Sequence, residues 1–305
     1  MRRLNDTKPD DRDDSGVATI FVILAMTAML VGAALAIDVG GYVAAARSAQ
    51  NSADATVLAV ATDCALNGAP IADYARYRKA GQTITTPACG SGESTITVTK
   101  TVDGLLLAQS AGDVDRSATA RWGTLSRANT VPLVIADCEF RAPATGTIVT
   151  LYLDDPKPQS GCSSLPGGFS QLDKSECSVP ISANGTVAGV PGVGGLQNKI
   201  LCLTNPPPAA ALPRTVLIPI YSTSACKAID CKGKGPYLIL GFAALEVSGY
   251  SFNGNVYDGS LGKKCPDEKD RGKYCIRGKY VEWVSSLGTP GPSTDYGVTQ
   301  VYLYS

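Results

Sequence analysis

The chain has 305 residues, and its 27 lysines and arginines balance its 27 aspartates and glutamates. This balance excludes a global field that would steer nucleic acid to the protein, and an apolar content of 44 % excludes a disordered chain. Because the sequence contains no histidine, it lacks the commonest general base of enzymes and the commonest zinc ligand. We therefore predict a protein that is not an enzyme, with no catalytic residue, no metal, no cofactor and no nucleic-acid partner.

A membrane-spanning helix is predicted near the N-terminus. Residues 1–16 are polar and are expected to form a cytoplasmic tail, whereas residues 17–37 contain no charged side chain. As a helix, residues 17–37 would span about 31 Å, enough for a hydrocarbon core of about 30 Å. A buried helix of a soluble domain is the alternative.

Charge counts orient this helix. Four lysines and arginines precede the apolar run, and in the twenty residues after it only Arg47 is cationic. The positive-inside rule then keeps the N-terminus in the cytoplasm and exports the remainder across the cell membrane. Ala34-Leu35-Ala36 has the form of a signal-peptidase site, but the run exceeds the usual h-region of about 7–15 residues, so we expect a retained single-pass anchor.

The helical pattern continues beyond the apolar run to about Thr62. Side chains recur at alternating steps of four and three along one stripe, which we call the Val39–Val60 stripe: Val39, Val43, Ala46, Gln50, Ala53, Val57 and Val60. Four residues at steps of four form a small-residue ridge: Ala28, Gly32, Ala36 and Gly40. Such a ridge lets another helix approach closely and permits a helix-mediated oligomer, although alanine and glycine are also simply common in membrane helices.

An even number of cysteines in an exported segment indicates disulfides. The ten are Cys64, Cys89, Cys138, Cys162, Cys177, Cys202, Cys226, Cys231, Cys265 and Cys275. Their connectivity does not follow from the sequence, but short loops favour the pairs Cys64–Cys89, Cys162–Cys177, Cys226–Cys231 and Cys265–Cys275, leaving Cys138–Cys202. Zinc is the competing interpretation, and the closely spaced cysteine pairs that it requires are missing from the sequence.

The exported part is predicted to be α+β, with a helix-containing neck over residues 38–130 and a β-rich, disulfide-braced domain over 131–305. In the neck we expect a short helix over 71–80 and strands over 94–99, 105–107 and 114–122. In the outer domain we expect strands over 132–136, 147–153, 214–221, 237–247, 276–284 and 297–304, with long loops over 185–195 and 206–211.

Two further motifs are assigned to ordinary structure. Asn184-Gly185-Thr186 matches a glycosylation acceptor, a tripeptide that arises often by chance. Tyr221-Ser222-Thr223-Ser224 has the alternating serines of a von Willebrand type A metal site, but tyrosine stands where that site requires aspartate. We predict no metal there.

Residues 16–61 resemble the N-terminal segment of the TadE/TadG-like Flp pilus-assembly family. The residues that carry the resemblance are Asp38, Gly40, Arg47, Gln50, Asn51, Ala53 and Asp54. Two positions depart from the family pattern, because Ala49 and Ser52 replace a common leucine and alanine. A weaker likeness to cysteine-rich actinobacterial members lies in residues 166–169, 241–244 and 278–281.

The resemblance implies a membrane-anchored component of a Tad secretion or pilus system, acting in assembly and not in chemistry. Its partners would be other Tad/Flp pilus assembly proteins, pseudopilins and the lipid bilayer. Processed prepilin-like relatives carry glutamate at the fifth position of the apolar segment, where this chain has Phe21, which favours an uncut TadG-like type. The alternative is an anchored or secreted envelope-binding module or adhesin.

Overall fold

The computed structural model describes residues 15–102, 112–140, 146, 148–152, 169–172, 178–190, 214–229, 231, 235–252, 255–258, 265, 274–285 and 289–304. The chain divides into two compact units. Unit 1 comprises Met1–Thr56, Ala75–Thr86 and Ile96–Ala118, and unit 2 comprises Val57–Tyr74, Pro87–Thr95 and Thr119–Ser305. The predicted division at residue 130 stays a prediction.

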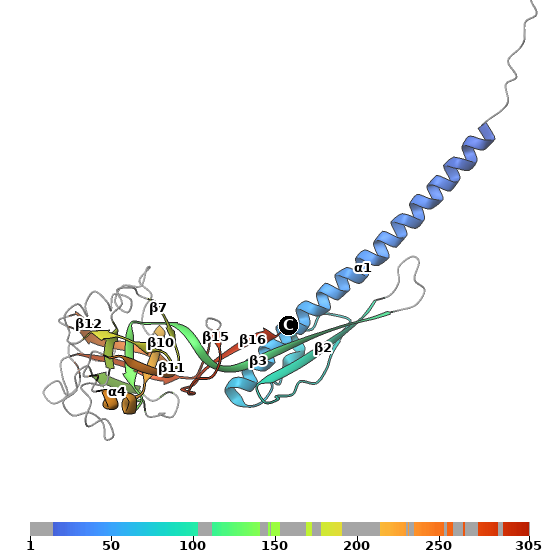
Figure 1. Cartoon of the computed structure of the whole chain (residues 1–305). Helices are drawn as coiled ribbons and strands as arrows, with labels where there is room; N and C mark the ends of the chain where they lie inside the picture. Colours follow the sequence, from blue (N-terminus) through green and yellow to red (C-terminus); the bar gives the residue numbers. More distant parts are fainter. Residues whose placement is uncertain are drawn as a thin grey trace, which may run out of the picture. The chain divides into compact units, whose positions relative to one another are not determined.

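One long helix, α1 (Ser15–Asn67), occupies the start of the described chain (Figure 1). Its 53 residues extend for about 80 Å. The helix ends at Gly68, which adopts a φ of 70° and donates its N–H to the Cys64 carbonyl at 3.0 Å. Among the described residues, α1 holds the one helix long and apolar enough to cross a membrane. It therefore fits membrane anchoring, as predicted.

A short helical turn, η1 (Tyr74–Tyr77), follows α1 and is all that forms of the helix expected over residues 71–80. Three antiparallel strands come next, namely β1 (Gln82–Ile84), β2 (Glu93–Val102) and β3 (Gly112–Thr130). Alternate side chains of β2 are buried, as the strand period requires. On the exposed face of β2 and β3 within unit 1, Thr97 Oγ1 shares a hydrogen bond with Ser117 Oγ at 2.8 Å, and Thr99 donates to Asp115 Oδ1 at 2.5 Å.

The remaining described elements are mostly strands. They are β4 (Leu133–Ala136), β5 (Ile148–Tyr152), β6 (Phe169–Leu172), β7 (Val179–Ser182), β8 (Thr186–Val187), β9 (Gly189–Val190), β10 (Arg214–Tyr221), α4 (Thr223–Ile229), β11 (Tyr237–Phe252), β12 (Asn255–Asp258), β13 (Cys275–Val281), β14 (Trp283–Ser285), β15 (Thr289–Pro290) and β16 (Val298–Tyr304). The overall class is α+β with a β-rich, disulfide-braced part, as the sequence predicts.

A mixed sheet with the strand order β5-β13-β11-β10-β4-β6-β9 forms the centre of unit 2. Its long antiparallel pair joins β10 to β11, and β4 lies parallel to β10 with Ile135 opposite Ile220. Successive residues of β10 enter different cores, because Ile218 and Ile220 pack in one hydrophobic cluster and Tyr221 in another. Both faces of the sheet are therefore buried, which explains the nearly uninterrupted apolar sequence of β4 and β10.

Two glycines allow close approaches at the motifs that carry the weaker likeness. A Cβ atom on Gly241 would collide with the Thr294 carbonyl oxygen and the Tyr296 ring. A Cβ atom on Gly278 would lie 2.6 Å from the Glu246 carbonyl oxygen of the paired strand β11. Both positions therefore require glycine for packing.

The strands differ from the predicted elements at two places. Residues 276–284 were expected as one strand, but β13 joins the central sheet while β14 pairs in parallel with β16. Residues 185–195 were expected as a loop, yet β8 and β9 form there, after a turn in which Asn184 adopts a φ of 59°. The expected segments over 105–107 and 206–211 lie outside the described residues.

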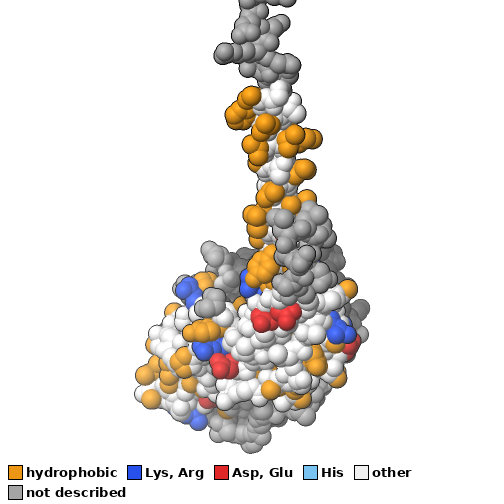
Figure 2. Space-filling view, turned by 90° about the vertical axis from the view of Figure 1, so that its right-hand side faces the viewer, with side chains coloured by type: hydrophobic (Ala, Val, Ile, Leu, Met, Phe, Trp, Pro, Cys, Tyr) orange, Lys and Arg blue, Asp and Glu red, His pale blue; other side chains and the backbone are white. Residues whose placement is uncertain are grey.

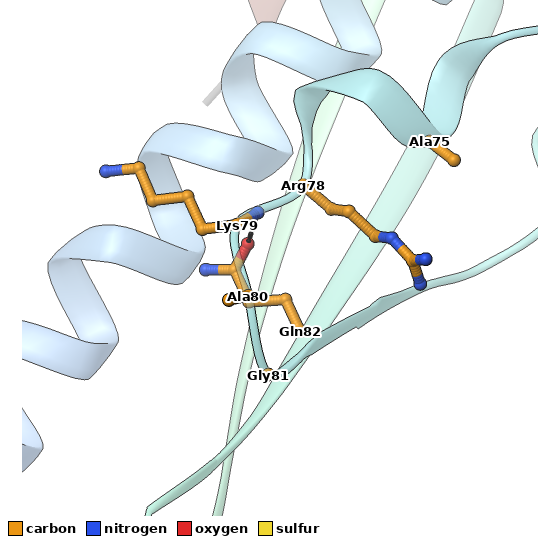
Figure 3. Close-up of a pocket in the computed structure, with 6 residues that line it drawn as sticks. All are labelled: Ala75, Arg78, Lys79, Ala80, Gly81 and Gln82. Carbon is orange, nitrogen blue, oxygen red and sulfur yellow. Dashed lines mark hydrogen bonds between the residues drawn. The ribbon is translucent and has the colours of Figure 1, made fainter.

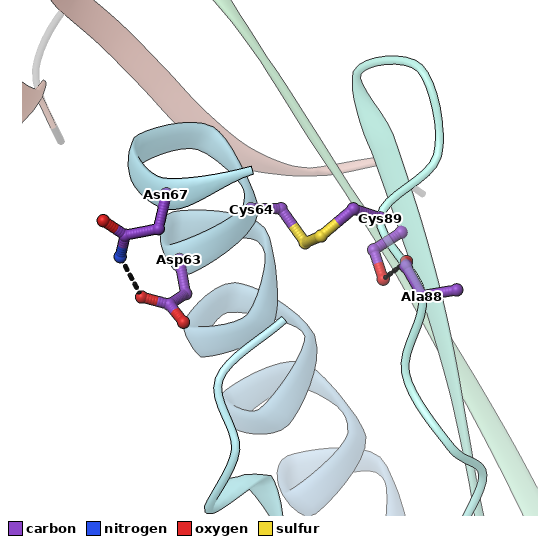
Figure 4. The surroundings of a disulfide bond; sticks show 6 residues. Asp63, Cys64, Asn67, Ala88 and Cys89 are labelled. Atoms are coloured by element: carbon purple, nitrogen blue, oxygen red, sulfur yellow. Dashed lines mark hydrogen bonds between the residues drawn. A yellow bond between two sulfur atoms is a disulfide. The ribbon is translucent and has the colours of Figure 1, made fainter. Parts of the chain in front are cut away.

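Disulfides brace unit 2. Cys64–Cys89, Cys226–Cys231 and Cys265–Cys275 are bonded, as the short-loop pairing predicts, and Cys138 is also disulfide-bonded. Cys162, Cys177 and Cys202 lie outside the described residues. Figure 4 shows Cys64, on the last turns of α1, joined to Cys89 in the segment that leads to β2. This bond fixes the C-terminal end of the helix within unit 2.

Burial of Tyr280 predicts an alkaline loss of stability. Its hydroxyl has no hydrogen-bond partner among the described residues, and burial, with a smaller contribution from Glu139, raises the pKa of Tyr280 above its ordinary value. Below pH about 10 the phenol is protonated in both states, and at higher pH only the unfolded state ionises readily, so the free energy of unfolding falls as the pH rises. Urea unfolding of Tyr280→Phe, followed by tryptophan fluorescence, should show a shallower decline above pH about 10. An equal decline in both proteins would contradict this role.

Candidate functional site: the helix α1

Within unit 1, the part of α1 that begins at Ala45 is covered by other residues of the same chain. We call this part the covered half and the part before it the bare half. Burial begins at Ala45 and continues at helical spacing through Ala45, Ala46, Ala49, Ser52, Ala53 and Thr56. All six side chains are small, so they permit a close approach of the neighbouring backbone. In the same unit, Ile96, Val98 and Val114 are buried on one face of β2 and β3. We infer that the buried faces of the helix and of these strands form one apolar layer.

Gln82 fastens this layer. Its side chain is 3 % exposed, and its Nε2 donates to Ser48 Oγ on α1 at 3.3 Å. Its Oε1 accepts the Lys79 backbone N–H at 2.8 Å. A buried amide with both ends engaged stabilises the position of the turn against the helix. Sequence reasoning missed Gln82, because nothing in its local pattern distinguishes it from an exposed strand residue.

The first half of the helix has no cover within the described chain. Large apolar side chains from Val17 to Val43 are exposed, and Figure 2 shows them projecting around the helix. The small-residue ridge lies within this bare part, and a Cβ atom built on Gly32 or Gly40 would meet nothing within 4 Å. The ridge is therefore not used in packing by the described residues.

The Val39–Val60 stripe is divided between the two halves. Val39 and Val43 are 54 % and 42 % exposed, whereas Ala46 and Ala53 are buried in unit 1 and Val57 and Val60 in unit 2. The Val39–Val60 stripe is thus mostly the stripe with which the helix packs on its own chain, although its helical period alone would equally suit a partner helix. Only its membrane-proximal end remains open to another molecule.

The polar residues of the family motif cluster on the outer side of the covered half. Gln50 Nε2 donates to Asp54 Oδ1 at 2.7 Å, which joins two motif residues one turn apart. Arg47 and Asn51 are exposed, and Asp38 is half-exposed where the apolar run ends. Ala53 is completely buried among the small side chains. The motif therefore combines a packing position with a solvated polar face, and its residues do not converge on a reaction centre.

The alternating serines after β10 cap a helix. Ser222 Oγ accepts the Ala225 backbone N–H at 3.2 Å and shares a hydrogen bond with Ser224 Oγ at 2.9 Å. Asp137 Oδ1 accepts the Thr223 N–H at 3.2 Å. These contacts stabilise the start of α4, which is the ordinary role of such side chains.

Comparison with known families identifies the helical segment. Residues 16–63 match the family model Tad, described as Flp pilus-assembly TadE/G-like. The match confirms the resemblance predicted from the sequence and associates the chain with Tad/Flp pilus assembly. No curated protein and no solved structure matches the chain. The Tad segment ends one residue before Cys64, so it covers nearly all of α1 and none of the strands.

Overpacking the covered face should loosen the helix. We expect Ala53→Leu to destabilise the packing of α1 by about 1–3 kcal/mol, because the buried site has no room for three more carbon atoms. The matched control is Ala55→Leu, which adds the same atoms at an exposed position of the same turn. Hydrogen exchange of full-length protein in detergent should show faster exchange over residues 45–56 in the first variant only. Equal exchange in the two variants would refute the packed layer.

Proposed function

We propose that this protein is a membrane-anchored structural component of a Tad/Flp pilus assembly or secretion system. It acts through helix packing in the bilayer and through an exported, disulfide-braced domain. The observation that carries the proposal is the division of the Tad segment at Ala45. The family segment packs on its own chain beyond that point and presents a bare apolar helix before it.

This division suits an assembly component. One end of α1 is packed on its own chain. A partner that binds the other end within the membrane is therefore linked through the helix to the exported part of the protein. The small-residue ridge supplies a surface for close helix contact, since Ala28, Gly32, Ala36 and Gly40 have no neighbour within the described chain. The partners we infer are other Tad/Flp assembly proteins, pseudopilins or a second copy of α1.

Two features support a cytoplasmic N-terminus. Lysine and arginine are concentrated before the apolar run, which keeps that end inside. The disulfides of unit 2 form and persist in oxidising surroundings outside the cytoplasm. The β-rich part therefore belongs on the extracytoplasmic side of the cell membrane.

The ridge is tested by enlarging its central glycine. We expect Gly32→Leu to lower the yield of site-specific crosslinks between α1 and its membrane partners by about tenfold, because a side chain at this position separates the helices. Its matched control is Gly41→Leu, which lies on the opposite side of the helix and also has open space around it. An equal crosslink yield in both variants would eliminate the ridge as the contact surface.

The mass of the mature N-terminal peptide from the membrane fraction tests the anchor. We expect a peptide that begins at Met1 or Arg2, because the apolar run is longer than a removable signal. A start at Val17 would instead indicate a processed, prepilin-like subunit. A start near Ile37, with protein in the medium, would contradict the anchor and favour a secreted binding module.

A further inference from the structure

The burial pattern of α1 locates the membrane surface on the helix. The first charged residue after the apolar run is Asp38, and exposed apolar side chains continue through Tyr42 and Val43. Tyrosine favours the headgroup level of a bilayer, where its ring is in apolar surroundings and its hydroxyl is in water. The part of α1 that is covered by its own chain begins at Ala45, which is 5 % exposed. The headgroups therefore lie between Asp38 and Val43.

A cationic turn is fastened to the helix just beyond this level. The turn, residues 75–82, contacts α1 through the hydrogen bond from Gln82 to Ser48. Ser48 lies six residues after Tyr42, which is about 9 Å along the helix axis. This separation is about one screening length at physiological salt, and the long side chains of lysine and arginine shorten it further.

The turn carries three cationic residues and no acidic residue. Residues 75–86 include Arg76, Arg78 and Lys79 and contain no aspartate or glutamate. Arg78 and Lys79 are exposed, and neither is ion-paired among the residues that the structure describes. They line a hollow of about 290 Å³ together with Ala75, Ala80, Gly81 and Gln82 (Figure 3). Figure 3 shows the two cationic side chains extending from opposite sides of the turn.

Charge in unit 1 is separated by the two faces of its strands. Lys100 lies directly opposite Gln82 across the β1–β2 pair, and opposite residues of such a pair share a face. This is the face toward α1, and it adds another cation to the turn. The acidic residues Asp113 and Asp115 lie on the other face, where they accept hydrogen bonds from Thr101 and Thr99. The cationic face thus fits an anionic surface.

We propose that the cationic turn 75–82 binds the phosphate groups of anionic phospholipids at the membrane surface from which α1 emerges. The shared chemistry is a phosphate anion, and the position of the turn beside the bilayer selects the lipid headgroup over free phosphate. Cations that lie close together at a membrane surface attract anionic lipid. This binding rests on α1 crossing a membrane, and it does not depend on the role in pilus assembly.

The fold, and not the sequence order, brings these charges to the bilayer. Arg76 is 39 residues after Ile37 (76 minus 37), beyond the window of about 15–20 residues in which flanking charges set topology. The turn therefore contacts headgroups without contradicting the predicted orientation. Lipid binding at the turn 75–82, together with the hydrogen bond from Gln82 to Ser48, would hold the turn and the covered half of α1 against the membrane surface.

Photo-crosslinking in proteoliposomes tests the site. Full-length protein is reconstituted in phosphatidylcholine with a photoactivatable phosphatidylglycerol, and labelled peptides are mapped by mass spectrometry. We expect labelling of residues 75–82 that falls about tenfold in Arg78→Gln/Lys79→Gln. Labelling of the unaltered protein should also fall when salt rises from about 0.1 to about 1 M, because the screening length shortens from about 10 to about 3 Å.

Matched controls separate the possible results. Arg127→Gln/Lys227→Gln removes the same charge from exposed positions in unit 2 and should label like the unaltered protein. Equal labelling of the Arg78→Gln/Lys79→Gln protein, or equal labelling by a zwitterionic phosphatidylcholine probe, would overturn the proposal. Loss of labelling on addition of millimolar inorganic phosphate at constant ionic strength would also overturn it and would assign the turn to free phosphate. Circular dichroism of each variant checks that the fold is retained.

Discussion

Close packing of small side chains along α1 is the constraint on which the rest of this structure depends. A single helix must meet lipid over its first half and protein over its second, and the change occurs at Ala45. Ala49 and Ala53 keep the covered face narrow enough for strands to lie against the helix, and Gln82 fastens the turn to Ser48. Larger residues at these positions would separate the layers and expose the buried amide.

The same division explains why the family segment has two kinds of apolar surface. Residues 16–63 match the Tad model although they contain two physically different halves. In the bare half, glycine and alanine create a surface for another helix, whereas in the covered half alanine creates a surface for the chain's own strands. The two departures from the family pattern, Ala49 and Ser52, are both buried on the covered face, where small residues suit the packing.

Polar and cysteine side chains stabilise both the helix and the strands. The serines after β10 cap α4, Cys64–Cys89 fastens the end of α1 within unit 2, and Gln50 pairs with Asp54. Threonines and aspartates form a hydrogen-bonded ladder on the exposed face of β2 and β3. The surface chemistry of unit 1 is instead electrostatic, with cations on the face toward α1 and carboxylates on the opposite face.

The sequence by itself determined what depends on neighbours along the chain. The charge-free run predicted α1, alternation of strand-forming residues predicted β2, and an apolar run between turn residues predicted β10. Short spacing predicted the pairs Cys226–Cys231 and Cys265–Cys275. Only the tertiary structure decided which partner each periodic face meets. It assigned most of the Val39–Val60 stripe to the chain's own packing, placed β13 and β14 in different sheets, and brought the turn at Arg78 beside Ser48. Periodicity specifies that a face is buried, but the element that buries it is distant in sequence, and no local pattern encodes that pairing.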